Sequence, residues 1–200
     1  MKLGIDRNKA IELVDKYIKD KVTKLHLLET EAIMQALAKH FGEDEEKWGI
    51  IGLLHDIDWE LTKDNPETHG IKMTEILSEA GGSDYLIKTI QSHVYGQGWG
   101  DNFCGSPEFK ELKRSGKLQY SLAAAETLTG LIIASVLVQP DKKLKSVKLK
   151  SLKKKFKSKS FAANCSREII MECEETGLSL DEFLEIGLKA LQGISDEIGL

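Results

Sequence analysis

The chain has 200 residues and a formal net charge of −4, with 41% hydrophobic and 30% charged residues. A chain of this length can bury a core without disulfides or a structural metal, and it suits one domain. The balance of apolar and charged residues is typical of a globular protein and argues against disorder.

The N-terminal stretch MKLGIDRNKAIEL lacks the apolar core of a signal peptide. The longest apolar segment, SLAAAETLTGLIIASVLV, is interrupted by Glu126 and several polar residues. We therefore expect a cytoplasmic protein without a membrane segment. The three cysteines, Cys104, Cys165 and Cys173, lack C-x-x-C spacing and are odd in number, so we expect reduced thiols and an inert, buried Cys173.

Apolar residues recur at helical spacing along most of the chain, and no segment shows the alternation of a strand. The expected helices cover residues 7–18, 24–41, 44–58, 67–80, 85–93, 117–138, 160–177 and 179–200. The expected caps are Asp6, Asp44, Ser83 or Asp84, Ser160, and Ser179 or Asp181, with Gly42 closing the second helix and Pro66 opening the fourth. A glycine-rich, irregular segment over 94–117 separates the two halves.

These elements predict a single all-α domain over residues 1–200. Its core is expected over about 20–135, with a lysine-rich segment (141–160) and closing helices (161–200) packed on it. Gly49 and Gly52 lie three residues apart on one helix, which permits close packing against a neighbouring helix.

Polar groups with metal-binding chemistry stand on helices that otherwise look like core. His55 and Asp56 follow an apolar run, and Glu126 lies within the alanine-rich segment AAAETLTG. A lone histidine or glutamate of this kind is more often structural. Together they favour a shared ion, because a buried carboxylate needs a cation and helical bundles can build such sites between facing helices. Imidazole and carboxylate ligands suit divalent Fe, Mn, Co, Ni or Zn.

The order His26, His55-Asp56, Glu126 resembles that of the HD-domain superfamily of metal-dependent phosphohydrolases, named for its His-Asp doublet. The resemblance implies an HD-like helical bundle, here with two extra C-terminal helices, and a metal held by these four residues. Glu126 stands where the family has Asp and reaches one methylene further. The stretches LLHDIDWE, AAETLTGLI and KKKFKSKSFAA are similar to a subgroup of predicted hydrolases with an HDIDxE motif.

His69 and His93 match two further histidines of the superfamily's binuclear branch, in which the doublet's Asp bridges two metals. The resemblance thus implies one or two divalent ions per chain, Mg included. A metal-activated water would attack the substrate, with Asp56 and Asp58 as the candidate catalytic residues. Asp58 can orient His55 through its ring N–H or accept a proton from the nucleophile; alternatively it caps the helix or faces solvent.

Residues 141–160 carry ten Lys and one Asp, whereas the rest of the chain is acidic. One or two of these lysines are expected to bind substrate phosphate, the candidates being Lys154, Lys155, Lys157 and Lys159. Most of the run must nevertheless be solvated. Weaker candidates come from the irregular segment: Lys113, Arg114 and Lys117 for phosphate, and Tyr95, Trp99 and Phe103 for an aromatic wall that packing explains equally well.

The function expected is hydrolysis of a small phosphate ester or a nucleotide. A di-iron oxygenase on the same scaffold and a non-catalytic nucleotide- or protein-binding domain are the alternatives. The acidic remainder of the chain argues against nucleic acid as a partner, and no membrane contact is expected. The sequence leaves the substrate, the identity of the metal and the oligomeric state open.

Overall fold

The computed structural model of the chain describes residues 1–95 and 105–200. Within these ranges the chain forms helices and loops and no strand, which confirms the all-α prediction. The α-helices are α1 (Arg7–Tyr17), α2 (Lys21–Phe41), α3 (Glu45–Leu54), α4 (Trp59–Thr62), α5 (Ile71–Glu79), α6 (Asp84–Gln91), α7 (Lys117–Leu137), α8 (Leu149–Lys157), α9 (Arg167–Met171), α10 (Leu180–Gly193) and α11 (Ser195–Ile198). Short 3₁₀ helices are η1 (Pro66–Thr68), η2 (Ser92–Val94), η4 (Pro107–Phe109), η5 (Leu144–Ser146) and η6 (Glu172–Thr176).

Helix boundaries follow the capping residues. The side chains of Asp6, Asp44, Ser83 and Ser179 accept hydrogen bonds from the first turns of α1, α3, α6 and α10, as predicted. Gly42 ends α2 in the left-handed conformation, with φ of 70°. Ser160 caps no helix, because α9 begins later and takes Ser166 as its cap.

The helices expected over 160–177 and 179–200 are each divided in the structure, into α9 and η6 and into α10 and α11. Two further differences bear on the polar residues. The helix expected to reach residue 58 ends at Leu54, so His55 and Asp56 lie in the turn that follows α3. The helix expected from residue 67 is split, since Pro66 opens the separate turn η1 and Gly70 has a φ of 84° that no α-helix continues through. As a result, His55, Asp56 and His69 lie in turns between helices and not within a continuous helix.

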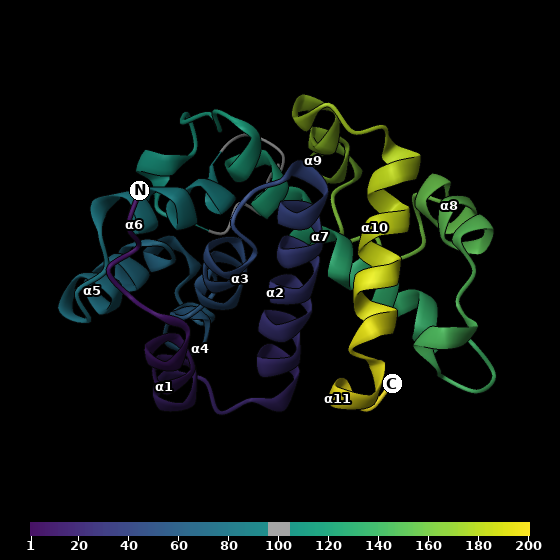
Figure 1. Cartoon of the computed structure of the whole chain (residues 1–200), viewed down its shortest axis with the longest axis horizontal. Helices are drawn as coiled ribbons and strands as arrows, with labels where there is room; N and C mark the ends of the chain where they lie inside the picture. Colours follow the sequence, from purple (N-terminus) through teal and green to yellow (C-terminus); the bar gives the residue numbers. More distant parts are fainter. Residues whose placement is uncertain (96–104) are drawn as a thin grey trace.

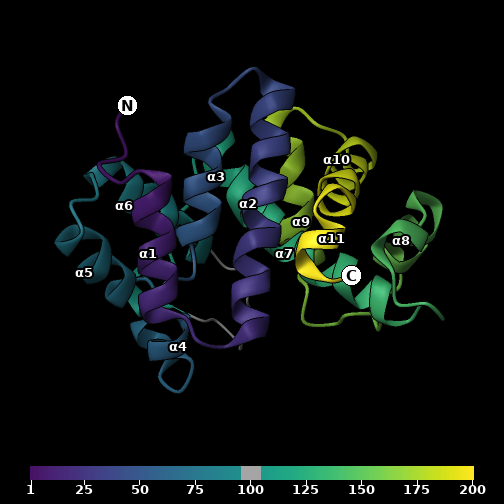
Figure 2. The same ribbon diagram turned by 60° about the horizontal axis from the view of Figure 1, so that its bottom comes forward.

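Helices α2, α3 and α7 form the middle of the molecule, with α1, α4, α5 and α6 on one side and α8, α10 and α11 on the other (Figures 1 and 2). α2 packs against α3, α7 and α10, and α7 packs against α9 and η6. By length and composition α7 can span a membrane, yet 67% of its most apolar window is buried inside the protein, as in a central helix of a bundle. The domain boundaries and the cytoplasmic location stay predictions.

The described cysteines carry no disulfide: Cys165 is partly buried and Cys173 is fully buried. Burial raises the pKa of the Cys173 thiol to about 12, which matches the expected inert residue. Cys104, Trp99 and Phe103 lie outside the described residues.

Gly52 lets α3 approach the backbone of α2. A Cβ at this position would lie 3.0 Å from the carbonyl oxygen of Thr30 and 3.1 Å from the amide nitrogen of Glu31. Main-chain atoms of a helix cannot move aside as a side chain can, so the two helices would have to separate. The close approach predicted from the glycine spacing is therefore present at Gly52, whereas Gly49 faces the Gln35 side chain.

Gly52→Ala is expected to lower the free energy of unfolding by about 1–3 kcal/mol, the usual cost of overpacking a core. Denaturant unfolding followed by circular dichroism measures the change. The matched control is Gly193→Ala in α10, where an added Cβ meets nothing within 4 Å and alanine is the better helix former. Equal unfolding midpoints for the Gly52 variant and the unmodified protein would show that the helices have room to spare.

Candidate metal centre

Four histidines and one aspartate meet at the centre of the bundle, although they come from separate elements. His26 lies on α2, His55 and Asp56 follow α3, and His69 and His93 come with η1 and η2. The side chain of His55 is fully buried, and those of His69 and His93 are about 3% exposed. The structure thus brings together all the histidines that the sequence singled out.

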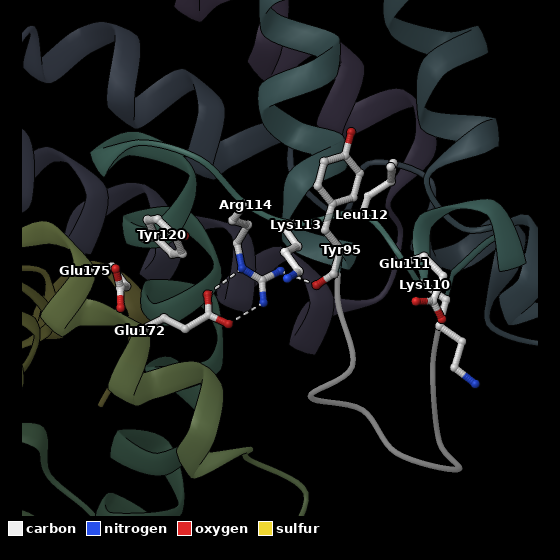
Figure 3. Close-up of a pocket in the computed structure, with 9 residues that line it drawn as sticks. All are labelled: Tyr95, Lys110, Glu111, Leu112, Lys113, Arg114, Tyr120, Glu172 and Glu175. Atoms are coloured by element: carbon white, nitrogen blue, oxygen red, sulfur yellow. Dashed lines mark hydrogen bonds and ion pairs between the residues drawn. The ribbon is translucent and has the colours of Figure 1, made fainter.

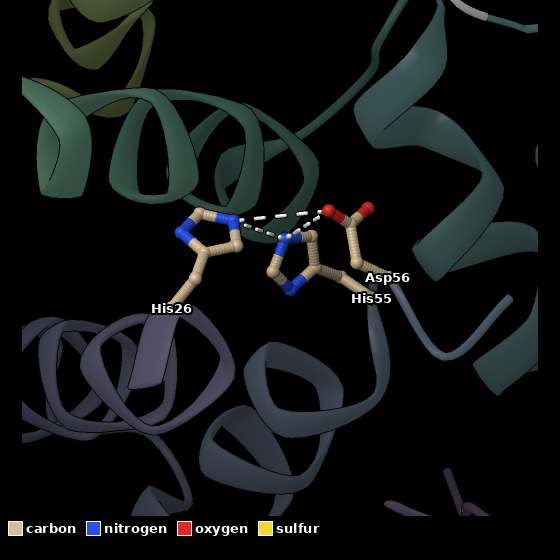
Figure 4. Close-up of side chains that lie close together, drawn as sticks. All are labelled: His26, His55 and Asp56. Atoms are coloured by element: carbon tan, nitrogen blue, oxygen red, sulfur yellow. Dashed lines mark hydrogen bonds and ion pairs between the residues drawn. The ribbon is translucent and has the colours of Figure 1, made fainter. Parts of the chain in front are cut away.

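Asp56 lies between two histidine pairs (Figure 4 shows it with His26 and His55). Its Oδ2 is 3.8 Å from His26 Nε2 and 3.6 Å from His55 Nε2. Its Oδ1 is 3.4 Å from His69 Nε2 and 3.1 Å from His93 Nε2. One carboxylate oxygen therefore faces each pair, and two groups with possible metal ligands result, which share Asp56.

Within each pair the two Nε2 atoms are 3.1 Å apart, between His26 and His55 and between His69 and His93. Two imidazole nitrogens bound to one ion at about 2.0–2.1 Å, roughly at right angles, lie about 3 Å apart. The spacing of both pairs therefore fits a divalent ion.

The opposite ring nitrogens fix which atom faces the centre. His55 Nδ1 donates to the Gly52 carbonyl (2.7 Å) and His93 Nδ1 donates to the Ile90 carbonyl (2.6 Å). A carbonyl only accepts, so each Nδ1 carries the ring proton and leaves a lone pair on Nε2. This is the arrangement in which a histidine binds metal through Nε2.

His26 and His69 are oriented by side chains instead. Thr129 Oγ1 donates to the Glu126 carbonyl (2.6 Å) and accepts from His26 Nδ1 (2.9 Å). Asp58 Oδ1 accepts from His69 Nδ1 at 2.9 Å. All four imidazoles therefore turn Nε2 towards Asp56. Sequence reasoning missed Thr129, whose only signal is its place one turn after Glu126.

Burial and the neighbouring charges set the protonation of the centre. Burial lowers the pKa of His55 to about 3, so the lone pairs of His26 and His55 face each other without a proton between them. Burial disfavours a charge on Asp56, but His55, His69 and His93 outweigh it and hold the pKa of that carboxyl well below its usual range. Burial likewise disfavours a proton on His69, but Asp56 and Asp58 raise its pKa. A cation between the His26–His55 lone pairs relieves their repulsion, so the donor set fits a metal.

Asp58 does not orient His55, contrary to one of the roles expected for it, because His55 Nδ1 already donates to Gly52. It is fully buried and faces no solvent. Besides His69, its carboxylate accepts from the backbone N–H groups of Gly70 (2.9 Å) and Met73 (3.0 Å). Gly70 is the N-cap residue of α5 and has no side chain to cap the helix. The carboxylate of Asp58, twelve residues earlier, takes this role.

Glu126 lies beside the cluster and outside both groups of possible ligands. Its Oε1 accepts from the Thr127 hydroxyl at 2.6 Å, and burial raises the pKa of its carboxyl to about 8. It lines a pocket of about 170 Å³ together with His26 and with Asn164 and Cys165 from the loop before α9. The sequence predicted a helix over 160–177 in place of that loop, and metal binding by Glu126 stays a prediction.

Neither the pocket that Lys154 and Lys157 line nor the hydrogen bond of Lys155 includes a member of the cluster, so phosphate binding by the lysine-rich segment stays a prediction. Lys154 and Lys157 line a separate pocket with Leu149, Lys150 and Lys153, and Lys155 Nζ donates to the Ser135 carbonyl (3.1 Å). Lys159 is exposed in the loop after α8. Buried Leu152 and Phe156 dock α8 on α7 and α10, at the edge of the molecule away from α3 (Figure 1).

The phosphate candidates of the irregular segment do not line the pocket beside His26 either, although Arg114 donates to the His93 carbonyl at 3.4 Å. Arg114 is buried and paired with Glu172, and Lys117 Nζ lies 4.2 Å above the ring of Phe41. Tyr95 and Lys113 line a pocket that contains no member of the cluster. No Lys or Arg is among the described residues that line the pocket beside His26.

The described residues form a helical bundle in which four histidines surround one aspartate, and the class of protein is therefore an all-α protein with a candidate metal centre. The family model of the HD domain matches residues 24–134, more than half of the chain, and the chain belongs to this family. The matched range contains His26, His55, Asp56, His69, His93 and Glu126. Membership indicates a family of metal-dependent hydrolases that bind divalent ions, while the HDIDxE subgroup stays a prediction. Searches of curated proteins and of solved structures gave no match.

Proposed function

We propose that the protein is a metal-dependent phosphohydrolase that cleaves a small phosphate ester or a nucleotide. The observation that carries the proposal is the presence of two histidine pairs, each with its Nε2 atoms 3.1 Å apart, on either side of Asp56. His26 and His55 would hold one ion, His69 and His93 a second, and Asp56 would contact both. A divalent ion held there supplies hydroxide at neutral pH.

The remaining residues of the site bind and orient. Asp58 and Thr129 keep the rings of His69 and His26 turned inward. The pocket beside His26, with Glu126, Thr127 and Asn164 in its wall, offers hydrogen-bonding groups for the organic part of a small substrate. Because no Lys or Arg lines the described part of this pocket, the bound metals are the proposed partners of the phosphate charge.

The test is phosphate release by protein purified without chelators and then loaded with Mn²⁺, Co²⁺, Fe²⁺, Ni²⁺, Zn²⁺ or Mg²⁺. We expect release from at least one member of a panel of phosphate monoesters and nucleotides, and loss of this release when a chelator removes the metal. Metal analysis by mass spectrometry should give up to two ions per chain. Bound metal without phosphate release from any member would contradict the proposal.

A di-iron oxygenase is the second candidate, favoured by the completeness of both histidine pairs. It predicts two irons per chain and oxygen consumption, measured on the iron-loaded protein with polyols and phosphonates as trial substrates. A non-catalytic domain is the third, and the position of Glu126 outside the ligand groups is its support. It predicts nucleotide or protein binding without turnover.

A further inference from the structure

We propose that the Arg114–Glu172 ion pair positions His93 and thereby completes the His69–His93 half of the metal centre. Arg114 and His93 lie in the range matched by the family model, whereas Glu172 lies beyond it, in η6. The inference rests on the proposed metal centre and adds that the C-terminal part of the chain is required for one of its two ions.

The first step of the argument is the burial and geometry of the ion pair. The Arg114 side chain is 4% exposed, and its Nε and Nη2 donate to the two carboxylate oxygens of Glu172 at 2.5 and 2.6 Å (Figure 3). The planar guanidinium binds both oxygens of a carboxylate at once and still has a nitrogen to spare. Glu172 thus fixes the plane in which that third nitrogen points.

The third nitrogen, Nη1, donates to the backbone around His93. Its acceptors are the carbonyls of Ser92 at 2.9 Å, His93 at 3.4 Å and Tyr95. These carbonyls lie in and just after η2, which follows α6, and that of Ser92 also accepts from the Tyr95 N–H at 3.2 Å. Figure 3 shows the guanidinium between the Glu172 carboxylate and the Tyr95 carbonyl. One side chain therefore holds the main chain on both sides of a proposed ligand.

The position of this backbone sets the position of the His93 ring. His93 Nδ1 donates to the carbonyl of Ile90, three residues earlier, so the ring is tied to its own short turn. If the turn moves, the ring moves with it, and Nε2 leaves its place 3.1 Å from both His69 Nε2 and Asp56 Oδ1. Arg114 does not contact the ring, so it is a positioning residue.

The His26–His55 half of the centre is held in a different way. His55 donates to Gly52, which packs on the backbone of α2, and His26 donates to Thr129 on α7. Within residues 1–95 and 105–200, the hydrogen bonds of Arg114 and Glu172 reach none of these residues. Loss of the ion pair should therefore lower the metal affinity of the His69–His93 pair and leave that of the His26–His55 pair unchanged.

The experiment is a Co²⁺ titration of the full chain, followed by absorption spectroscopy and checked by metal analysis. The first variant is Arg114→Lys, which keeps the positive charge but cannot bind both oxygens of Glu172 and the backbone carbonyls at once. The second is Glu172→Gln, which keeps the size of the side chain and removes only its charge. The matched control is Arg167→Lys, because Arg167 also donates to backbone carbonyls, those of Phe156, Ala162 and Cys165 among them, but to none of the four histidines or Asp56. Circular dichroism establishes that each variant is folded, and Glu172→Gln carries the test if Arg114→Lys is not.

We expect two binding steps in the unmodified protein and in the Arg167 control. One of the two steps depends on His93. In the Arg114 and Glu172 variants the Co²⁺ affinity of that step should fall about 10–100-fold, the usual effect of losing a residue that supports a ligand. His93→Ala identifies that step, since it removes the same ligand directly. The other step should keep its affinity and its spectrum.

Two results overturn the inference and leave the proposed metal centre intact: both steps unchanged in the variants, or both weakened equally, which indicates general damage. Fewer than two Co²⁺ ions bound by the unmodified protein would overturn the two-ion centre itself, and this inference with it.

Discussion

Asp56→Asn is expected to release metal from both histidine pairs and to abolish metal-dependent hydrolysis. The Asp56 carboxylate faces all four Nε2 atoms, at 3.1–3.8 Å, with one oxygen towards each pair. An amide has one oxygen and no charge, so it can serve only one pair, and weakly. Because residues that merely support ligands are worth 10–100-fold in metal affinity, loss of the shared carboxylate should cost at least about 100-fold at each ion.

The measurement is metal content after dialysis against a weak chelator, together with phosphate release from the substrate found in the panel. Asp64→Asn is the matched control, since Asp64 is an exposed carboxylate on the segment after α4. The control should bind metal and turn over substrate as the unmodified protein does. An Asp56→Asn protein that kept two tightly bound ions would show that Asp56 is a neighbour of the centre and not a shared ligand.

Much of the candidate metal centre could be predicted from the sequence because its possible ligands leave a local mark. His55 and Asp56 interrupt an apolar run, and His26, His69 and His93 stand at helices or their ends, within the range that the family model matches. The fold class followed from helical periodicity. The capping residues of α1, α3, α6 and α10 were identifiable because an N-cap acts within its own turn.

The residues that orient the ligands could not be predicted, because their partners are distant in sequence. His26 and Thr129 are 103 positions apart, and Arg114 and Glu172 are 58 apart. Local pattern carries no information on such pairs. The position of the lysine-rich segment could not be predicted for the same reason. Its composition suits phosphate binding, but the packing of Leu152 and Phe156 on the rest of the protein decides where its lysines lie.

Asp58→Asn is expected to lower the free energy of unfolding by about 3 kcal/mol, near the cost of breaking a buried, charge-assisted network. The carboxylate accepts from three donors, His69 Nδ1 and the amides of Gly70 and Met73, and is itself fully buried. An asparagine oxygen can still accept from the two amides, which then leaves its NH₂ group facing His69. Asp44→Asn is the matched control, because Asp44 is an exposed local cap and asparagine caps equally well.

The same substitution separates the structural role that the contacts of Asp58 indicate from the proton-accepting role expected from the sequence. With an NH₂ group opposite Nδ1, His69 must accept there and carry its proton on Nε2, the atom that faces Asp56. If the role of Asp58 is structural, the variant should have a lower free energy of unfolding and a lower metal affinity at the His69–His93 pair. Denaturant unfolding measures the first and Co²⁺ titration the second, and neither needs a substrate. A proton-accepting Asp58 predicts the reverse pattern, with stability and metal content retained and turnover alone lost. Because three donors already occupy the carboxylate, the structure favours the first outcome.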